Sequence, residues 1–303
     1  MARRRDAVTG HPERARGLRA AALAVVVGLV GGCRDSGGER VDRRAGQQPE
    51  TLAHGPEKSD IALDRVWATD DPAPMTGRPC VGDARGRSAG PGLNDFELPV
   101  HLFLGTGVTA DALRVETDAA RSYFARYGLR MRAMSAAAVA MDFAIGGGAP
   151  ATDQAIRRAV APMRAFLAAY AVPATPSVNI VLLPIVLQKS SPIARFLQDL
   201  SGLALTPHGL ADERAAPLRD ALALEQYTPT VFLSLRDLRR ARPGLRQTTL
   251  AHELGHALGL SHSDERTGLM ASARDADCVP QLSASELEQM RAMLAEYGQP
   301  PGK

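Results

Sequence analysis

The sequence predicts a domain of the α+β class, in which short apolar strands and helices share one core. Two observations predict it. Strand-like and helix-like segments are interleaved along the last two thirds of the chain. In addition, 45% of the 303 residues are hydrophobic, which is enough to bury a sizeable core. The first third of the chain has a different composition and predicts a leader and a linker.

The first 32 residues have the pattern of an export signal. Six arginines precede an apolar run from Ala20 to Val30, which is shorter than the roughly 18 to 20 residues of a membrane-spanning helix. The run ends in two glycines and Cys33, which resembles the lipobox of bacterial lipoproteins. This resemblance implies that residues 1–32 are a lipoprotein signal peptide and that lipidation of Cys33 anchors an exported protein to a bacterial membrane, in the periplasm or at the cell surface. A plain secretory signal that is cut elsewhere and an uncut anchor are the alternatives.

Residues 33–95 are expected to form a flexible tether. Glycine and proline make up 15 of residues 34–95, about a quarter, against 49 of all 303 residues. Apolar periodicity is weak, apart from a local contact expected around residues 61–67. The tether would hold the folded domain, residues 96–299, away from a membrane.

The charge distribution argues against nucleic-acid binding through a basic face. The formal net charge is +3, but residues 1–32 carry +4, which leaves −1 for the rest of the chain. Aromatic residues make up 4% of the chain, so base-stacking platforms are not expected either. We therefore expect no nucleic-acid partner, and the sequence carries no signal for an oligomeric state.

The folded region begins with a strand, helix, strand unit. Residues 99–104 form the first strand. Thr109 is a suitable N-cap for a helix that runs to Tyr127, and Gly128 is suited to end it. Residues 129–134 then predict the next strand.

Later segments predict two more helices and three more strands. A helix over about residues 152–171 contains Pro162, so it is expected to be kinked or split. Ser283 and Glu286 form a capping box for a last helix that ends near Gly298. Short apolar runs predict the strands, at residues 178–183, 202–205 and 231–235.

Residues 252–262 have the sequence His-Glu-x-x-His-x-x-Gly-x-x-His, in which the histidines have the spacing of metal ligands. His252 and His256 are four residues apart, so on a helix they offer two imidazoles to one zinc ion. Gly259 can adopt the backbone angles that end the helix, which lets His262 approach from another direction. Three protein ligands leave a position for water, as in catalytic zinc sites, and Glu253 lies beside the metal.

This motif resembles that of the metzincin clan of zinc endopeptidases, and within it most closely the matrixins. In matrixins a small or apolar residue commonly precedes the third histidine and a serine follows it, as Ser261 and Ser263 do here, and Met270 follows His262 by eight residues, as the methionine of the Met-turn does. The resemblance implies a zincin-like (metzincin) catalytic domain. Such a domain has a mixed twisted sheet, an active-site helix, a Met-turn that forms a floor under the metal, and a C-terminal helix. Residues 202–205 resemble the matrixin edge strand that holds substrate.

The resemblance also implies a zinc-dependent endopeptidase that hydrolyses peptide bonds in protein or peptide substrates. One catalytic Zn²⁺ would activate water, with Glu253 as general base and later as proton donor to the leaving amine. We expect one zinc only, because Leu205 stands where matrixins carry a histidine for a second ion. Two alternatives remain open: a zinc-binding lipoprotein that acts as a non-catalytic binding module, and a zinc hydrolase that acts on something other than protein.

Two further cysteines have two interpretations. If Cys33 is lipidated, Cys80 and Cys278 remain as an even pair in an oxidising compartment, which predicts a disulfide. Alternatively, residues 78–83 resemble, in scrambled order, the matrixin cysteine switch. In that family the propeptide thiolate occupies the open zinc position, so Cys80 would keep the enzyme latent.

Overall fold

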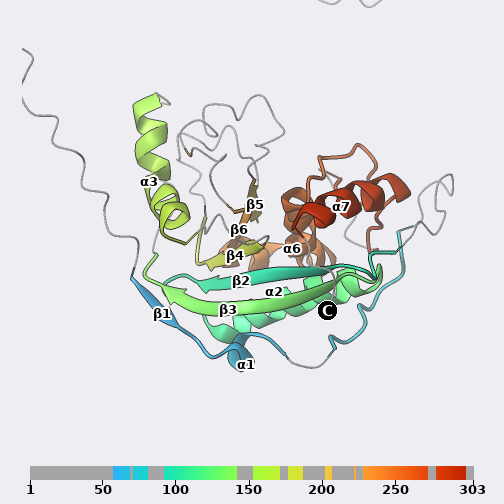
Figure 1. Cartoon of the computed structure of the whole chain (residues 1–303), viewed down its shortest axis with the longest axis horizontal. Helices are drawn as coiled ribbons and strands as arrows, with labels where there is room; N and C mark the ends of the chain where they lie inside the picture. Colours follow the sequence, from blue (N-terminus) through green and yellow to red (C-terminus); the bar gives the residue numbers. More distant parts are fainter. Residues whose placement is uncertain are drawn as a thin grey trace, which may run out of the picture. The chain divides into compact units, whose positions relative to one another are not determined.

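The structure is a computed structural model of the chain. It describes residues 57–68, 71–80, 92–141, 153–170, 177–186, 202–206, 222, 228–271 and 278–297, all of which belong to one compact unit. The predicted export signal and Cys33 lie outside the described residues. Helices and a six-stranded sheet form the unit, which confirms the α+β class (Figure 1).

The sheet is mixed, as the resemblance implied, and its strand order is β1-β3-β2-β4-β6-β5. The four central strands run parallel, whereas β1 pairs antiparallel with β3 at one edge and β5 pairs antiparallel with β6 at the other. The strands are β1 (Lys58–Asp60), β2 (Glu97–Leu104), β3 (Arg130–Val139), β4 (Val178–Leu183), β5 (Gly202–Leu205) and β6 (Thr230–Ser234).

Six helices are described: α1 (Leu63–Val66), α2 (Ala110–Ala125), α3 (Asp153–Tyr170), α5 (Leu235–Arg240), α6 (Pro243–Ala257) and α7 (Ala284–Tyr297). The hydroxyl of Thr109 accepts a hydrogen bond from the Ala112 amide, so it caps α2 as predicted. The last predicted strand ends one residue early, because the Ser234 side chain caps α5. α3 continues through Pro162 instead of being split there.

The sheet separates two apolar cores. Along β4, Ile180 and Leu182 belong to the core that contains α2, α6 and α7, whereas Val181 and Leu183 belong to the core that contains α3. All six residues of β4 are buried, as expected for a parallel strand covered on both faces. The sheet thus supports α6 from one side while α3 covers the other side.

The local contact expected around residues 61–67 is present, and the other described residues of 57–68 and 71–80, which the sequence assigned to the tether, also pack on the domain. β1 adds an edge strand to β3, and the Val66 side chain is fully buried in the core of α2 and α6. The Arg121 guanidinium lies 4.5 Å from the centre of the Trp67 ring. These few apolar side chains and strand hydrogen bonds are sufficient to order a segment whose glycine and proline content suggested a linker.

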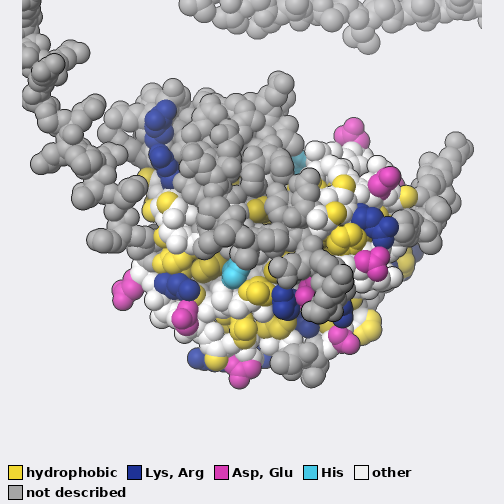
Figure 2. Space-filling view, viewed as in Figure 1, with side chains coloured by type: hydrophobic (Ala, Val, Ile, Leu, Met, Phe, Trp, Pro, Cys, Tyr) yellow, Lys and Arg dark blue, Asp and Glu magenta, His cyan; other side chains and the backbone are white. Residues whose placement is uncertain are grey.

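No described helix has both the length and the apolar character needed to cross a membrane. Acidic and basic side chains are interspersed over the coloured part of the face in Figure 2, so neither sign of charge dominates the described surface there.

Candidate metal centre

Helix α6 carries the first two predicted ligands and the predicted general base. It begins with Pro243 at its first position, where the missing amide hydrogen costs nothing. His252 and His256 lie one turn apart, and their ring centres are 4.8 Å from each other. The His252 side chain is buried and His256 is half-buried, so the pair lies where the helix leaves the core.

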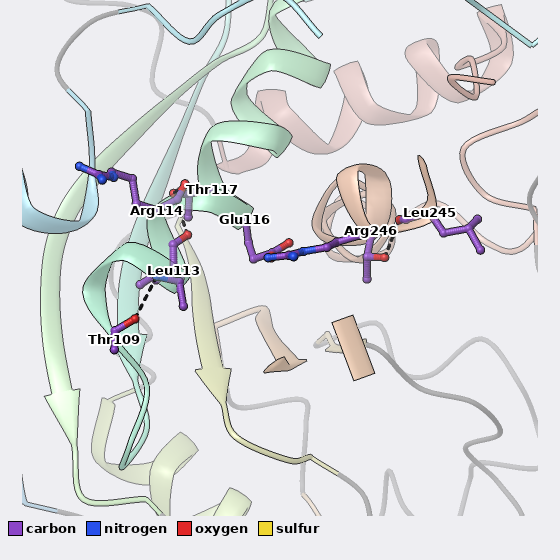
Figure 3. Close-up of polar contacts among 9 residues, drawn as sticks. Thr109, Leu113, Arg114, Glu116, Thr117, Leu245 and Arg246 are labelled. Carbon is purple, nitrogen blue, oxygen red and sulfur yellow. Dashed lines mark hydrogen bonds and ion pairs between the residues drawn. The ribbon is translucent and has the colours of Figure 1, made fainter. Parts of the chain in front are cut away.

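An ion pair with α2, in which only the carboxylate partner is fully buried, helps to fix the position of α6 (Figure 3). The Arg246 guanidinium donates to Glu116 Oε1 through Nε at 2.9 Å and Nη2 at 2.6 Å. The Glu116 side chain is 1% exposed. Burial raises the pKa of Glu116, and the Arg246 hydrogen bonds and charge offset part of that rise. The pair thus links the first half of α6 to the core helix beside it.

The chain reverses after α6 and brings the third histidine back to the first two. Gly259 has φ +86°, a conformation that favours glycine, and the Leu260 amide donates to the Gly255 carbonyl at 2.9 Å as in a Schellman turn. Helix α7 braces this turn, because the Gln289 side-chain amide donates to the Gly259 carbonyl at 2.6 Å. His262 Nε2 consequently lies 3.2 Å from His256 Nε2.

Two backbone carbonyls orient the helical histidines. His252 Nδ1–H donates to the Leu269 carbonyl at 2.7 Å, and His256 Nδ1–H donates to the Leu260 carbonyl at 2.8 Å. A carbonyl oxygen can only accept, so each Nδ1 carries the proton and each neutral ring has its lone pair on Nε2. This is the arrangement that metal-binding histidines adopt.

The three histidines fit a zinc ion. One nitrogen from each of His252, His256 and His262 can be chosen so that all three lie within 4.8 Å of one another. Zn–N bonds of about 2.0 to 2.1 Å in a tetrahedral site separate two nitrogens by roughly 3.3 Å, close to the 3.2 Å between His256 and His262. Among the described residues, these three form the one group of histidine, cysteine and acidic side chains able to hold a metal.

Met270 lies beneath α6, in the loop that follows the third histidine. The Ser263 amide donates to the Met270 carbonyl at 2.9 Å, which closes the loop over residues 263–270. The Met270 side chain is fully buried, and a Cβ added at Gly255 would lie only 2.5 Å from its sulfur. The sulfur therefore packs directly against the helix backbone, on the turn that separates His252 from His256.

The Glu253 side chain lies between α6 and the edge strand β5. A Cβ added at Gly202 would lie 2.5 Å from Glu253 Cγ and 2.8 Å from both Cδ and Oε1. Residue 202 therefore has to be glycine for the carboxylate to keep this position. Glu253 is 7% exposed, so its carboxylate is largely shielded from bulk water beside the predicted metal ligands.

The match to a known family falls on this segment. Residues 243–292, which include α6, the histidine turn and most of α7, match the Matrixin family model. This segment of the chain is therefore similar to the matrixins. No curated protein sequence matches the chain.

Two solved structures are similar to the chain at low sequence identity. Metalloproteinase-II from Bacteroides fragilis is 16% identical, with a TM-score of 0.41 over 73% of this chain. The chain spans 56% of the length of that protein. A zinc-dependent peptidase from Methanocorpusculum labreanum is 15% identical, with a TM-score of 0.30 over 64% of this chain and 99% of its own.

The cysteine pair predicted from the sequence is bonded in the structure. Cys80 and Cys278 form a disulfide, and Cys80 is 1% exposed. A bonded sulfur cannot act as a metal-binding thiolate, so the structure does not contain the alternative cysteine switch.

Sequence reasoning missed three groups at the site: the Leu260 and Leu269 carbonyls and the bare Cα of Gly202. The carbonyls have no sequence signal, because every residue carries one. The only available signal for Gly202 was its position at the start of a strand, where glycine is uncommon and often marks a close approach.

Proposed function

We propose that this chain is a zinc-dependent endopeptidase that hydrolyses peptide bonds in protein or peptide substrates. One observation carries the proposal: the imidazoles of His252, His256 and His262 converge, and Glu253 follows the first of them on the same helix. The first ligand is buried and the last is exposed, so the site has one protected side and one side open to a substrate.

The roles of the residues follow from their chemistry. His252, His256 and His262 would hold the ion. Zinc, when bound, supplies Lewis acidity, which polarises a scissile carbonyl and makes water more acidic. Glu253 takes the proton of the attacking water and passes it to the leaving amine. Its packing against Gly202 restricts where the carboxylate can lie, which lowers the cost of orienting it for this transfer.

β5 is the proposed support for the substrate main chain. Within the described part of the sheet, β5 is the last strand and pairs on one side only, with β6. An extended peptide can add to such an edge through main-chain hydrogen bonds. A peptide bound there would pass the Glu253 carboxylate, because Gly202 of β5 lies against it.

The proposed location is the exported face of a bacterial membrane, with the chain anchored by a lipid on Cys33. Three features support it: the export signal over residues 1–32, the cysteine that follows it, and the Cys80–Cys278 disulfide. Disulfides persist in oxidising compartments and are rare in the cytosol. Mass spectrometry of the protein from membranes tests this, since a diacylglyceryl group on an amino-terminal Cys33 is expected. An unmodified Cys33 within an uncut chain would contradict it.

Hydrolysis of a diverse peptide mixture by the purified full-length chain tests the activity, with zinc measured on the same sample. Glu253→Gln is the matched control, because it keeps the side-chain size and removes the base. Chelator-sensitive cleavage by the wild type and at least about a hundredfold slower cleavage by zinc-loaded Glu253→Gln are expected. Bound zinc without cleavage would refute the proposal and favour the non-catalytic binding module.

A further inference from the structure

The feature that carries a further inference is the segment of residues 278–282, which we name the bracing segment. It lies against the loop that contains Met270. The Leu269 amide donates to the Gln281 carbonyl at 3.0 Å, and the Gln281 amide donates to the Thr267 carbonyl at 3.0 Å. The backbone on both sides of Gly268 is thus fixed to Gln281.

One of these two hydrogen bonds is made by the same residue whose carbonyl orients His252. The Leu269 carbonyl accepts the hydrogen bond from His252 Nδ1, while the amide of the same residue is bonded to Gln281. A shift of the bracing segment would therefore move the carbonyl that sets the tautomer and ring orientation of His252. Partners of this kind typically change metal affinity by about 10- to 100-fold when they are lost.

The amino-terminal part of the domain holds the bracing segment from one side. Cys80 is joined to Cys278 by the disulfide. The Cys80 amide donates to the Val279 carbonyl at 2.9 Å, and the Val279 amide donates to the Arg78 carbonyl at 2.9 Å. Cys80, which the sequence assigned to a linker, is therefore bonded to a residue 198 positions later in the chain. That residue begins the segment that is hydrogen-bonded to Leu269.

Helix α2 and the residues after it hold the same segment through two tyrosines. The buried Tyr123 hydroxyl donates to the Pro280 carbonyl at 3.2 Å. The Tyr127 hydroxyl accepts from the Leu282 amide at 3.0 Å. The bracing segment is thus held at both of its ends and in its middle, and the Gln281 backbone is hydrogen-bonded to the Met270 loop.

We propose that the bracing segment is a positioning element for His252, and that the Cys80–Cys278 disulfide and the Tyr127 hydroxyl strengthen zinc binding through it. The proposal rests on the zinc site of the proposed function. It assigns to the disulfide a role at the metal centre, in addition to the general stabilisation that closing a long loop provides. It also makes zinc affinity sensitive to reduction of that disulfide.

The test is the zinc dissociation constant of the full-length chain, measured by competition with a chelator of known affinity. Cys80→Ala combined with Cys278→Ala removes the disulfide without leaving thiols that would bind zinc. We expect zinc binding at least about tenfold weaker in this double variant. Tyr127→Phe removes one hydroxyl only and should raise the zinc dissociation constant by a smaller factor. If the double variant does not fold, the zinc affinity of Tyr127→Phe alone tests the proposal.

Met163→Ala is the control for a loss of stability alone. Met163 is fully buried in the core on the α3 side of the sheet, away from the bracing segment. This variant should lose stability and keep the wild-type zinc affinity. Wild-type affinity in the disulfide and Tyr127→Phe variants would overturn the proposal, as would an equal loss in Met163→Ala. A wild-type chain that binds no zinc would overturn the proposed function itself, which is a separate outcome.

Discussion

The close contact between Gly202 and Glu253 makes a sharp prediction. Gly202→Ala adds a single methyl group to β5, at a point 2.5 Å from Glu253 Cγ. Ordinary van der Waals contacts of a Cβ begin at 3.4 Å, so the two groups must separate by roughly 1 Å. Cγ is in the middle of the side chain, so the whole carboxylate has to move with it.

A displacement of this size should be visible in kinetics. Misplacing a reacting group by about 1 Å can cost about a hundredfold in rate, so kcat/KM for a peptide substrate should fall by about that factor. The zinc dissociation constant should stay at the wild-type value, because the close contacts of residue 202 are with Glu253 rather than with the three histidines. Both quantities are measured on the same zinc-loaded preparation.

Gly107→Ala is the control for a general loss of stability. Gly107 has φ +78°, so alanine is strained there, but an added Cβ meets no atom within 4 Å. It should lower the melting temperature and leave kcat/KM of the folded protein unchanged. Wild-type kcat/KM in zinc-loaded Gly202→Ala would refute the argument that residue 202 sets the position of Glu253.

Three further predictions concern the ligands, the ion pair and pH. Loss of a ligand's hydrogen-bond partner typically weakens metal binding by roughly 10- to 100-fold, so loss of a ligand in His262→Ala should raise the zinc dissociation constant by more than that. Unchanged zinc affinity in a chelator competition would show that His262 is not a ligand. Glu116→Ala leaves the Arg246 guanidinium without its carboxylate, so denaturant titration should give a free energy of unfolding lower by about 1 to 3 kcal/mol. A neutral effect would mean that the pair does not hold α6. Burial raises the pKa of Asp237, but hydrogen bonds from Arg236 and Ser234 and the positive charges of Arg236 and Arg240 together outweigh it, so the pKa lies below its ordinary value. Its stabilising contribution is present above the ordinary pKa of about 4 and is lost as pH falls through the lowered value, so Asp237→Asn should flatten the acid side of a melting-temperature profile. Parallel profiles for the two proteins would count against this assignment.

Elements with a local signal were predictable from the sequence. Residues 178–183 and 202–205 are apolar runs of strand length, and both are strands with those bounds. The capping box predicted α7: the Ser283 amide donates to the Glu286 carboxylate at 2.7 Å, and the Glu286 amide donates to the Ser283 hydroxyl at 3.2 Å. The spacing of the metal-binding motif brought the three histidines together because it encodes one helical turn followed by a reversal.

Elements that depend on distant partners were not predictable. β3 continues to Val139, five residues beyond the predicted end, through an alanine-rich stretch with little strand propensity of its own. β1 pairs with its last three residues, Ala137 to Val139, and stabilises them. β1 in turn is only three residues long, and its polar residues, Lys58, Ser59 and Asp60, have no strand pattern that could have predicted it.

The most direct test of the central claim is a stepwise zinc titration of the metal-free full-length chain, with peptide cleavage measured at each step. If His252, His256 and His262 hold one catalytic ion, activity should rise in proportion to added zinc and level off at about one equivalent. Saturable zinc binding with no cleavage at any step, or cleavage that is already complete before zinc is added, would contradict the claim.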